Sequence, residues 1–402
     1  MDDNTVPSGS TTTLKSVEGD LEVGRHATIK GEKVTVSGTV YCEGNCTFEG
    51  SLSAENLEGE DDITINGNLE ISDRVSIEDG HLTVLGSLKA KRVEVDHGLR
   101  VGKNFEVEEV DVDGSLKVEG NTIAEEIEVG GTFEAEGTVK AETIEAGGSI
   151  TVKSKVDAED IDVGGSAVVN GGRAGKVDVG GSFVSTDSLE FESIDVGGTV
   201  KLSGENNAGG DIDVGGSCRI DGNLKFKTLD VGGVIEISGN SEGEDIDVGG
   251  RINVGKELRL SGDLDVGGTA EVGEKLTAEK IEIGGSLKAR QAVAAGEVEV
   301  GGSIETVEGT TAESVSIGRR GEVKGSIHAK EVIVGERARV EDVYADRIVL
   351  EEKAQAKNLY GKNIHLEYKS EVTGEVQYTE NLKTEESVHL ARQPKKVEKL
   401  PE

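Results

Sequence analysis

The chain contains the stretch Ile281-Glu282-Ile283-Gly284-Gly285-Ser286-Leu287-Lys288-Ala289, and copies of this pattern decide its fold. Gly-Gly pairs in the same register recur at spacings of 16 to 18 residues, beginning at Gly130, Gly147, Gly164, Gly180, Gly197, Gly215, Gly232, Gly249, Gly267, Gly284 and Gly301. A fixed period of this length is typical of repeat proteins, in which each repeat contacts mainly its neighbours.

The repeating unit extends well beyond the Gly-Gly pairs. Units begin near Leu21 and continue to one that begins near Ile364, which makes 21 units averaging about 17 residues. Apolar residues take the first and third, seventh and ninth, and thirteenth and fifteenth positions, as in Ile144, Ala146, Ile150, Val152, Val156 and Ala158. Each pair has the period-two alternation of a short strand. Three strands per unit predict an all-β fold, a single long three-sided parallel β-helix.

Two details of the coil follow from the same pattern. The Gly-Gly corners permit positive φ, which other residues resist. A right-handed coil is favoured, because parallel crossovers are overwhelmingly right-handed and because the units are less regular than a strict three-hexapeptide coil.

The domain organisation is predicted from where this pattern starts and stops. No proline lies between Pro7 and Pro394, which suits an uninterrupted ladder of backbone hydrogen bonds. We therefore predict a flexible polar N-terminal segment at residues 1–20, a continuous β-helix at 21–381 and a C-terminal tail at 382–402.

Charge excludes several classes of partner. The chain has 43 Lys and Arg residues against 79 Asp and Glu residues, a formal net charge of −36. Such a polyanion is repelled by nucleic acid and by anionic lipid. The sequence shows neither a secretory signal pattern nor an apolar run long enough for a transmembrane segment, so we expect a soluble cytoplasmic protein.

An acidic stripe is predicted on the outside of the coils. The second position of the unit points outward and is acidic in thirteen consecutive units: Glu94, Asp111, Glu128, Glu145, Asp162, Asp178, Asp195, Asp213, Asp230, Asp247, Asp265, Glu282 and Glu299. Stacked carboxylates repel one another, so the stripe is either a cation-binding or partner-docking surface, or a solvated face that keeps copies of the chain apart.

The same column changes character beyond Glu299. It continues as Ser316, Ile333, Val349 and His365, so Ile333 and Val349 form an apolar patch on an outward face. Exposed apolar surface of this kind usually has a cover. Either the C-terminal tail or another subunit is expected to supply it.

No catalytic, cofactor-binding or metal site is predicted. Cys42, Cys46 and Cys218 fall at inward positions and are expected to be buried free thiols. The segment 250–256 imitates the start of a phosphate-binding loop, but Glu257 replaces the required Ser or Thr and a strand pattern follows.

The chain resembles the bactofilin family of polymer-forming cytoskeletal proteins. The resemblance lies in units such as residues 281–289, in Gly374-Glu375-Val376-Gln377-Tyr378-Thr379-Glu380 and in the ending at residues 394–401. It implies a right-handed β-helix that polymerises end to end without nucleotide. The leading hypothesis is accordingly a structural, self-assembling cytoskeletal subunit and not an enzyme. The alternative is a non-polymerising scaffold that docks partner proteins on the acidic stripe or on the apolar patch.

Overall fold

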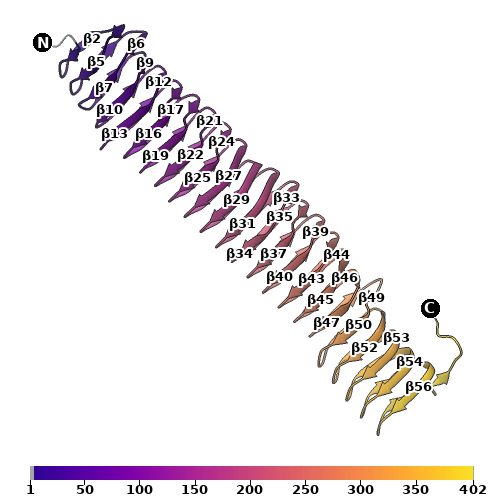
Figure 1. The fold of residues 1–402 in the computed structure, drawn as a ribbon. Coiled ribbons are helices and arrows are strands. Elements are labelled where there is room, and N and C mark those ends of the chain that lie inside the picture. The colour runs from indigo at the N-terminus through magenta and orange to yellow at the C-terminus, as the bar shows by residue number, and fades with distance from the viewer. Residues whose placement is uncertain (1–3, 402) are drawn as a thin grey trace. The chain divides into compact units, whose positions relative to one another are not determined.

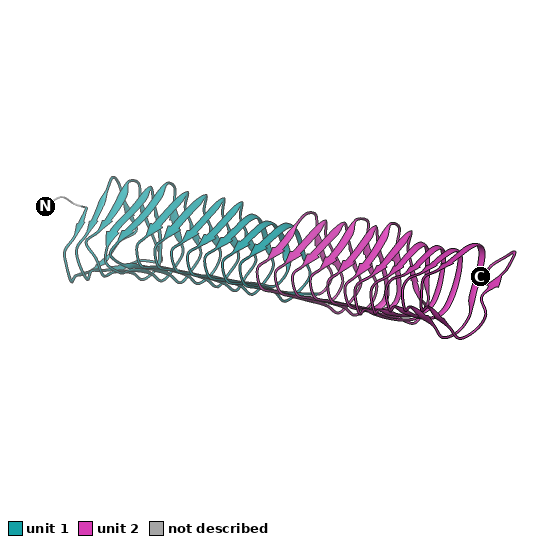
Figure 2. Cartoon of the chain, turned by 90° about the horizontal axis from the view of Figure 1, so that it is seen from below, with its two compact units in different colours: residues 1–203 teal, residues 204–402 magenta. Residues whose placement is uncertain are grey.

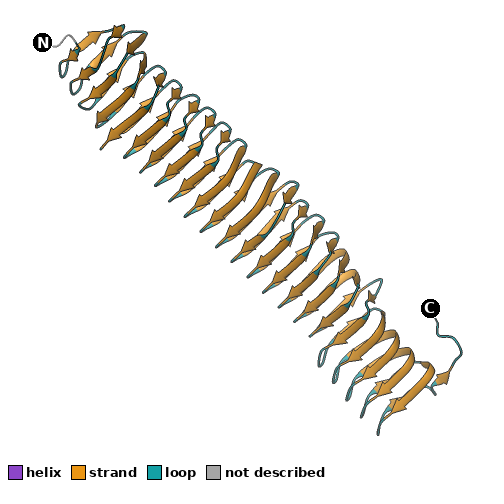
Figure 3. Cartoon of the chain, viewed as in Figure 1, coloured by secondary structure: helices purple, strands orange, loops and turns teal. Residues whose placement is uncertain are grey.

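The fold is a parallel β-helix. The structure is a computed structural model that describes residues 4–401, and all regular secondary structure in this range is β-strand (Figure 3). The coils number about 23 and average about 17 residues, which confirms the predicted fold class. The chain consists of two compact units, Met1–Ser203 and Gly204–Glu402 (Figure 2). Continuity of the β-helix between the two units, and its handedness, stay predictions.

Each coil contributes one strand to each of three faces. In the first two coils of unit 1, β1 (Thr5–Val6) pairs with β4 (Leu21–Val23), β2 (Thr11–Thr13) with β5 (Thr28–Lys30), and β3 (Ser16–Val17) with β6 (Lys33–Val36). All three pairings are parallel, and the same order repeats along each unit (Figure 1). We call the faces that begin with β1, β2 and β3 the first, second and third faces.

The first face carries the acidic stripe, and its strands there have the following bounds. In unit 1 they are β16 (Arg92–Val95), β19 (Glu109–Val112), β22 (Glu126–Val129), β25 (Thr143–Ala146), β27 (Val156–Val163), β29 (Gly172–Val179) and β31 (Leu189–Val196). In unit 2 they are β34 (Ile212–Val214), β37 (Thr228–Val231), β40 (Asp245–Val248), β43 (Asp263–Val266), β45 (Lys280–Ile283) and β47 (Glu297–Val300). The strands β27, β29 and β31 also include the preceding third-face strand, because the corner between them is extended.

The coils begin earlier in the sequence than predicted. The predicted flexible segment 1–20 includes three strands, and the first coil starts at Thr5. Val6 aligns with Val23, and Val17 aligns with Val36, so both valines continue apolar columns of the core. The threonines of β2 have a high preference for strands and complete the coil without an apolar pair. The polar composition of this coil hid it from the repeat pattern.

The tail also adds strands to the last coil. Strand β57 (His389–Leu390) pairs with β55 (Glu371–Val372) on the second face. Strand β58 (Lys395–Lys396) pairs with β56 (Val376–Thr384) on the third face. Together with the coil that starts at Thr5, this coil accounts for the difference between the 21 predicted units and the observed number.

The core consists of the inward columns that the pattern predicted. All six apolar residues of the unit Ile144, Ala146, Ile150, Val152, Val156 and Ala158 are buried. The phenylalanines at inward positions, Phe105, Phe133, Phe183, Phe191 and Phe226, are buried as well. Each inward side chain therefore packs against its counterparts in the coils before and after it.

The Gly-Gly corners do not use the positive φ that glycine permits. The residues with positive φ include Gly171 and Gly172, an out-of-register pair, but not the corner pairs Gly130-Gly131 or Gly147-Gly148. The corner glycines are needed for a different reason. A Cβ on Gly147 would lie 2.4 Å from the carbonyl oxygen of Gly130 in the preceding coil, and one on Gly148 would lie 2.5 Å from that of Gly131. Consecutive corners thus stack backbone on backbone, with no room for a side chain.

We expect Gly249→Ala to destabilise the coils at its corner more than Gly296→Ala does, because the corner at Gly296 has more space for a Cβ atom. The added Cβ would lie 2.6 Å from the Gly232 oxygen in the first case and 3.3 Å from the Glu279 oxygen in the second. Overpacking of this kind costs ~1–3 kcal/mol. Hydrogen exchange should show faster opening of the coils around Gly249, and equal exchange in the two variants would contradict the steric account.

Candidate interaction surfaces

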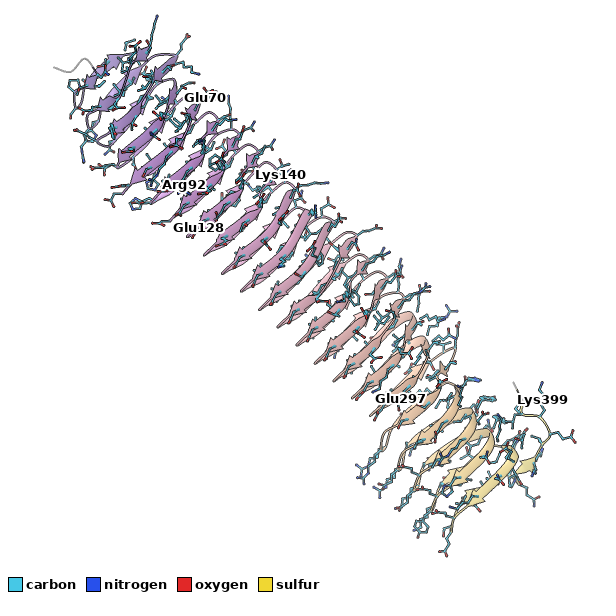
Figure 4. All side chains as sticks on the ribbon, viewed as in Figure 1. Glu70, Arg92, Glu128, Lys140, Glu297 and Lys399 are labelled. Atoms are coloured by element: carbon cyan, nitrogen blue, oxygen red, sulfur yellow. The ribbon has the colours of Figure 1, made fainter. Side chains whose placement is uncertain are left out.

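The acidic stripe is a continuous column within each unit. In unit 1 the strand register aligns Glu94 with Asp111, and each following member with the next as far as Asp195. In unit 2 the register aligns Asp213 with Asp230 and continues in the same way to Glu299. The side chains point away from the core, as the Glu128 side chain in Figure 4 illustrates. Neighbouring carboxylates are therefore one coil apart, ~4.8 Å along the axis of the unit.

The carboxylates of the stripe raise one another's pKa. Partial burial raises the pKa of Asp178, and the negative charges of Asp195 and Asp162 raise it further. For Glu128 the largest cause of the raised pKa is the charge of Asp111. Burial followed by neighbouring carboxylates raises the pKa in the same way at Asp111, Asp230 and Asp265. The folded protein therefore holds negative charge on this face at a cost in free energy.

The second face is compensated, unlike the stripe. There, several residues of opposite charge lie in consecutive coils and form ion pairs: Lys117–Glu134 at 2.7 Å, Arg219–Glu236 at 3.0 Å and Lys288–Glu271 at 3.1 Å. Within the described residues, two members of the stripe form ion pairs: Glu94 with Arg74, and Glu282 with Lys280. Among the described residues, most members of the stripe therefore lack an opposite charge that pairs with them.

The stripe does not have the geometry of a chelating site. Across residues 4–401, no group of three or more His, Cys, Asp or Glu side chains could hold a metal ion. Its members lie in a line instead of converging on a point, so it presents an extended field of negative charge. Such a field suits a basic protein surface or a diffuse layer of cations.

The predicted apolar patch continues the same column. Glu299 aligns with Ser316, and Ile333, Val349 and His365 follow in register. Ile333 and Val349 are half-buried, so neither side chain is fully exposed. The tail adds strands β57 and β58 to the last coil and leaves both residues half-buried. A second subunit remains the other predicted cover.

An aromatic column on the third face escaped the sequence prediction. The rings of His328 and Tyr344 stack with centroids 4.6 Å apart, and those of Tyr344 and Tyr360 with centroids 4.7 Å apart. Partial burial lowers the pKa of His328. The spacing of one coil between these residues could have identified the column. Because the rings cover one another's faces, they stabilise the coils and leave mainly their edges for a ligand.

All three cysteines are free and buried, as predicted.

No family model, no curated protein and no solved structure matches the chain. Among the described residues, no helix is long and apolar enough to cross a membrane.

We expect the stripe to make the protein more stable in mild acid. Carboxyls with a raised pKa bind protons more tightly in the folded state, so their contribution is greatest at low pH and is lost as the pH rises through the raised pKa. The triple variant Asp178→Asn, Asp230→Asn and Asp265→Asn should gain stability at about pH 7, where these three side chains are charged in the parent. Its free energy of unfolding should also change less than that of the parent as the pH rises through the raised carboxyl pKa.

The matched control is Glu134→Gln. Its ion pair with Lys117 lowers the pKa of Glu134, so its contribution is present above the ordinary carboxyl pKa and is lost on acidification. Thermal unfolding at several pH values measures both effects. If the stabilities of the triple variant and the parent differ by the same amount at every pH, the charges of the stripe do not destabilise the folded protein.

Proposed function

We propose that the protein is a structural subunit that assembles with copies of itself by stacking end coils, without nucleotide, in the manner of bactofilin-like polymers. The proposed role is mechanical and not enzymatic. The observation that carries the proposal is the state of the terminal coils, whose strands pair on one side only within the described residues.

The first coil has an open edge on all three faces. Strands β1, β2 and β3 pair with β4, β5 and β6, and no other described strand pairs with them. Backbone N–H and C=O groups at such an edge form a template for another strand. The strands of a second copy placed there would continue the ladder, in parallel or antiparallel orientation. Hydrogen bonds between the copies would replace hydrogen bonds between the edge strands and water.

The last coil supports the proposal through its apolar residues. Leu382 aligns with Ile364, and Leu390 aligns with Val372. Ile364 and Val372 are buried, whereas Leu382 and Leu390 are half-buried because no described coil lies beyond them. A coil from another copy would bury both leucines, which supplies the hydrophobic part of the contact.

The third face contributes least at this end. Pro394 precedes the two-residue strand β58, and Lys396 takes the column of Tyr378 and Gly361. Proline and lysine are residues that blunt strand edges. We therefore assign the contact at the last coil to the first and second faces, through Leu382 and Leu390.

The second candidate is a scaffold that remains monomeric and binds a basic protein along the stripe. The lack of compensation on the first face, in contrast with the ion pairs of the second, is what favours it. The two candidates differ in one observable, since only the first requires contacts between copies.

We expect the parent protein to assemble with rising concentration in the absence of nucleotide, and Leu382→Asp with Leu390→Asp to suppress assembly. A carboxylate buried at the contact costs more than 1.4 kcal/mol, so the concentration needed for assembly should rise at least about tenfold. Light scattering after size exclusion, together with negative-stain microscopy, measures the change.

The matched control is Asn381→Asp with His389→Asp. These residues are the neighbours of the two leucines on the same strands, but their side chains are exposed. The control should assemble like the parent. Filaments would indicate that both ends are used, and a stable dimer that one end is used. A parent protein that stays monomeric at every concentration and salt condition would reject the proposal in favour of the scaffold.

A further inference from the structure

Two histidines lie side by side at one corner of unit 1, between the first and second faces. His81 begins β14 (His81–Val84), and His97 immediately precedes β17 (Gly98–Val101), which is labelled in Figure 1. The two strands pair in parallel, so the histidines belong to consecutive coils. Their ring centroids are 5.5 Å apart, with the ring planes inclined at 51°. Both side chains are exposed, so solvent has access to the pair.

Glycines make room for the two rings. In the strand register His81 aligns with Gly98. A Cβ on Gly98 would lie 3.1 Å from Cδ2 of His81, so this edge of the His81 ring faces the coil of His97. The backbone N–H of His97 donates a hydrogen bond to the carbonyl of Gly80 at 3.2 Å, which places His97 in the column of Gly80. Each histidine therefore has a glycine of the other coil in its own column.

Asp62 orients the ring of His81. Its Oδ1 atom lies 3.1 Å from Nδ1 of His81 and accepts the backbone N–H of the same residue at 3.0 Å. The pKa of the Asp62 carboxyl is lowered, mainly because this backbone N–H donates to it, so the carboxyl is charged at neutral pH. A carboxylate only accepts hydrogen bonds, so Nδ1 carries the hydrogen and the lone pair of the neutral ring is on Nε2.

The free nitrogen of His81 lies on the side of the second histidine. Nε2 is bonded to Cδ2, and Cδ2 is the atom that lies against Gly98. Nδ1 and Asp62 are on the opposite edge of the ring. The His81 ring is thus fixed by a carboxylate from the coil before it and offers its lone pair toward the coil after it.

We propose that His81 and His97 form a two-histidine site for a divalent late transition-metal ion, bound through Nε2 of His81 and a ring nitrogen of His97. Imidazole is a preferred ligand of zinc, copper and nickel. With metal–nitrogen bonds of about 2.0–2.1 Å, two imidazoles on one ion have centroids about 5 Å apart. The observed separation of 5.5 Å is close to this value, and exposed side chains can rotate to meet it.

The pair supplies two ligands, and water completes the coordination. Across residues 4–401, no group of three or more His, Cys, Asp or Glu side chains could hold a metal ion, so Asp62 is a positioning residue and not a ligand. A carboxylate that accepts from the second nitrogen of a metal-binding histidine is the usual outer partner of such a site. The carboxylates of Asp79 and Asp96 are on the same corner, where Asp96 accepts the backbone N–H of Asp79 at 2.9 Å, and they add negative charge that attracts a cation.

The ordinary alternative is a ring contact with no ligand, beside a surface ion pair. An exposed ion pair such as His81–Asp62 contributes little to stability. The two readings differ in what zinc does, since only a metal site joins the two consecutive coils through an ion.

The test titrates the full chain with zinc chloride by calorimetry, in an excess of Mg²⁺. The excess occupies the acidic stripe, and Mg²⁺ prefers oxygen ligands to imidazole. We expect zinc to bind the parent, and His81→Gln and His97→Gln each to lose this binding. Asp62→Asn should weaken it about 10–100-fold, and Asp62→Glu should restore part of the loss.

The matched control is His389→Gln, which removes a single exposed histidine of the last coil and should bind zinc like the parent. Modification of the parent by diethyl pyrocarbonate gives a second readout that needs no variant. Zinc should slow the modification of His81 and His97 and leave that of His389 unchanged.

Zinc binding that both His81→Gln and His97→Gln leave intact would place the ion on the carboxylates of the surface and overturn the proposal. Equal modification of His81 and His97 with and without zinc would overturn it as well. An affinity that Asp62→Asn leaves unchanged would overturn the positioning role of Asp62.

Discussion

The stacking of one coil's backbone on the next is the constraint on which the rest of the structure depends. Gly147 donates a hydrogen bond to Val129, and Gly148 donates one to Gly131, each at 2.9 Å. These bonds hold consecutive corners so close that no Cβ fits between them. Once the coils are in this register, every side chain lies over its counterpart in the preceding coil. The inward columns form the core, and the outward columns become surfaces of repeated chemistry.

Because of this geometry, the charged side chains in an outward column either form ion pairs or repel one another. On the second face, the close spacing lets Lys117 and Lys288 form ion pairs with Glu134 and Glu271 in a neighbouring coil. On the first face, the same spacing places like charges beside one another. The charge of Asp111 raises the pKa of Glu128, and burial followed by neighbouring carboxylates raises the pKa of Asp178. The same ladder of hydrogen bonds leaves unpaired strand edges wherever the coils stop. The acidic stripe and the unpaired strand edges at the ends therefore both follow from the close stacking of the coils. Each is a surface that another molecule can bind.

The period of the sequence was enough to predict the columns. It located the inward residues of units such as Ile144 to Ala158, the thirteen members of the stripe and the patch at Ile333 and Val349, because a column depends only on spacing. It was not enough to explain the glycines. A glycine can be required by positive φ or by lack of space, and Gly147 and Gly148 need the second reason. The end coils escaped prediction because Thr12 and Lys396 take positions where other coils are apolar.

The central claim is that the end coils form the contact between copies. Hydrogen exchange of the backbone amides in β1, β2, β57 and residues 381–384 of β56, followed from low to high protein concentration, tests it most directly. We expect these amides to become protected as concentration rises, while amides in β22 and β37, which have paired neighbours on both sides, keep the same exchange rate. Exchange at the end coils that is the same at every concentration would contradict the claim.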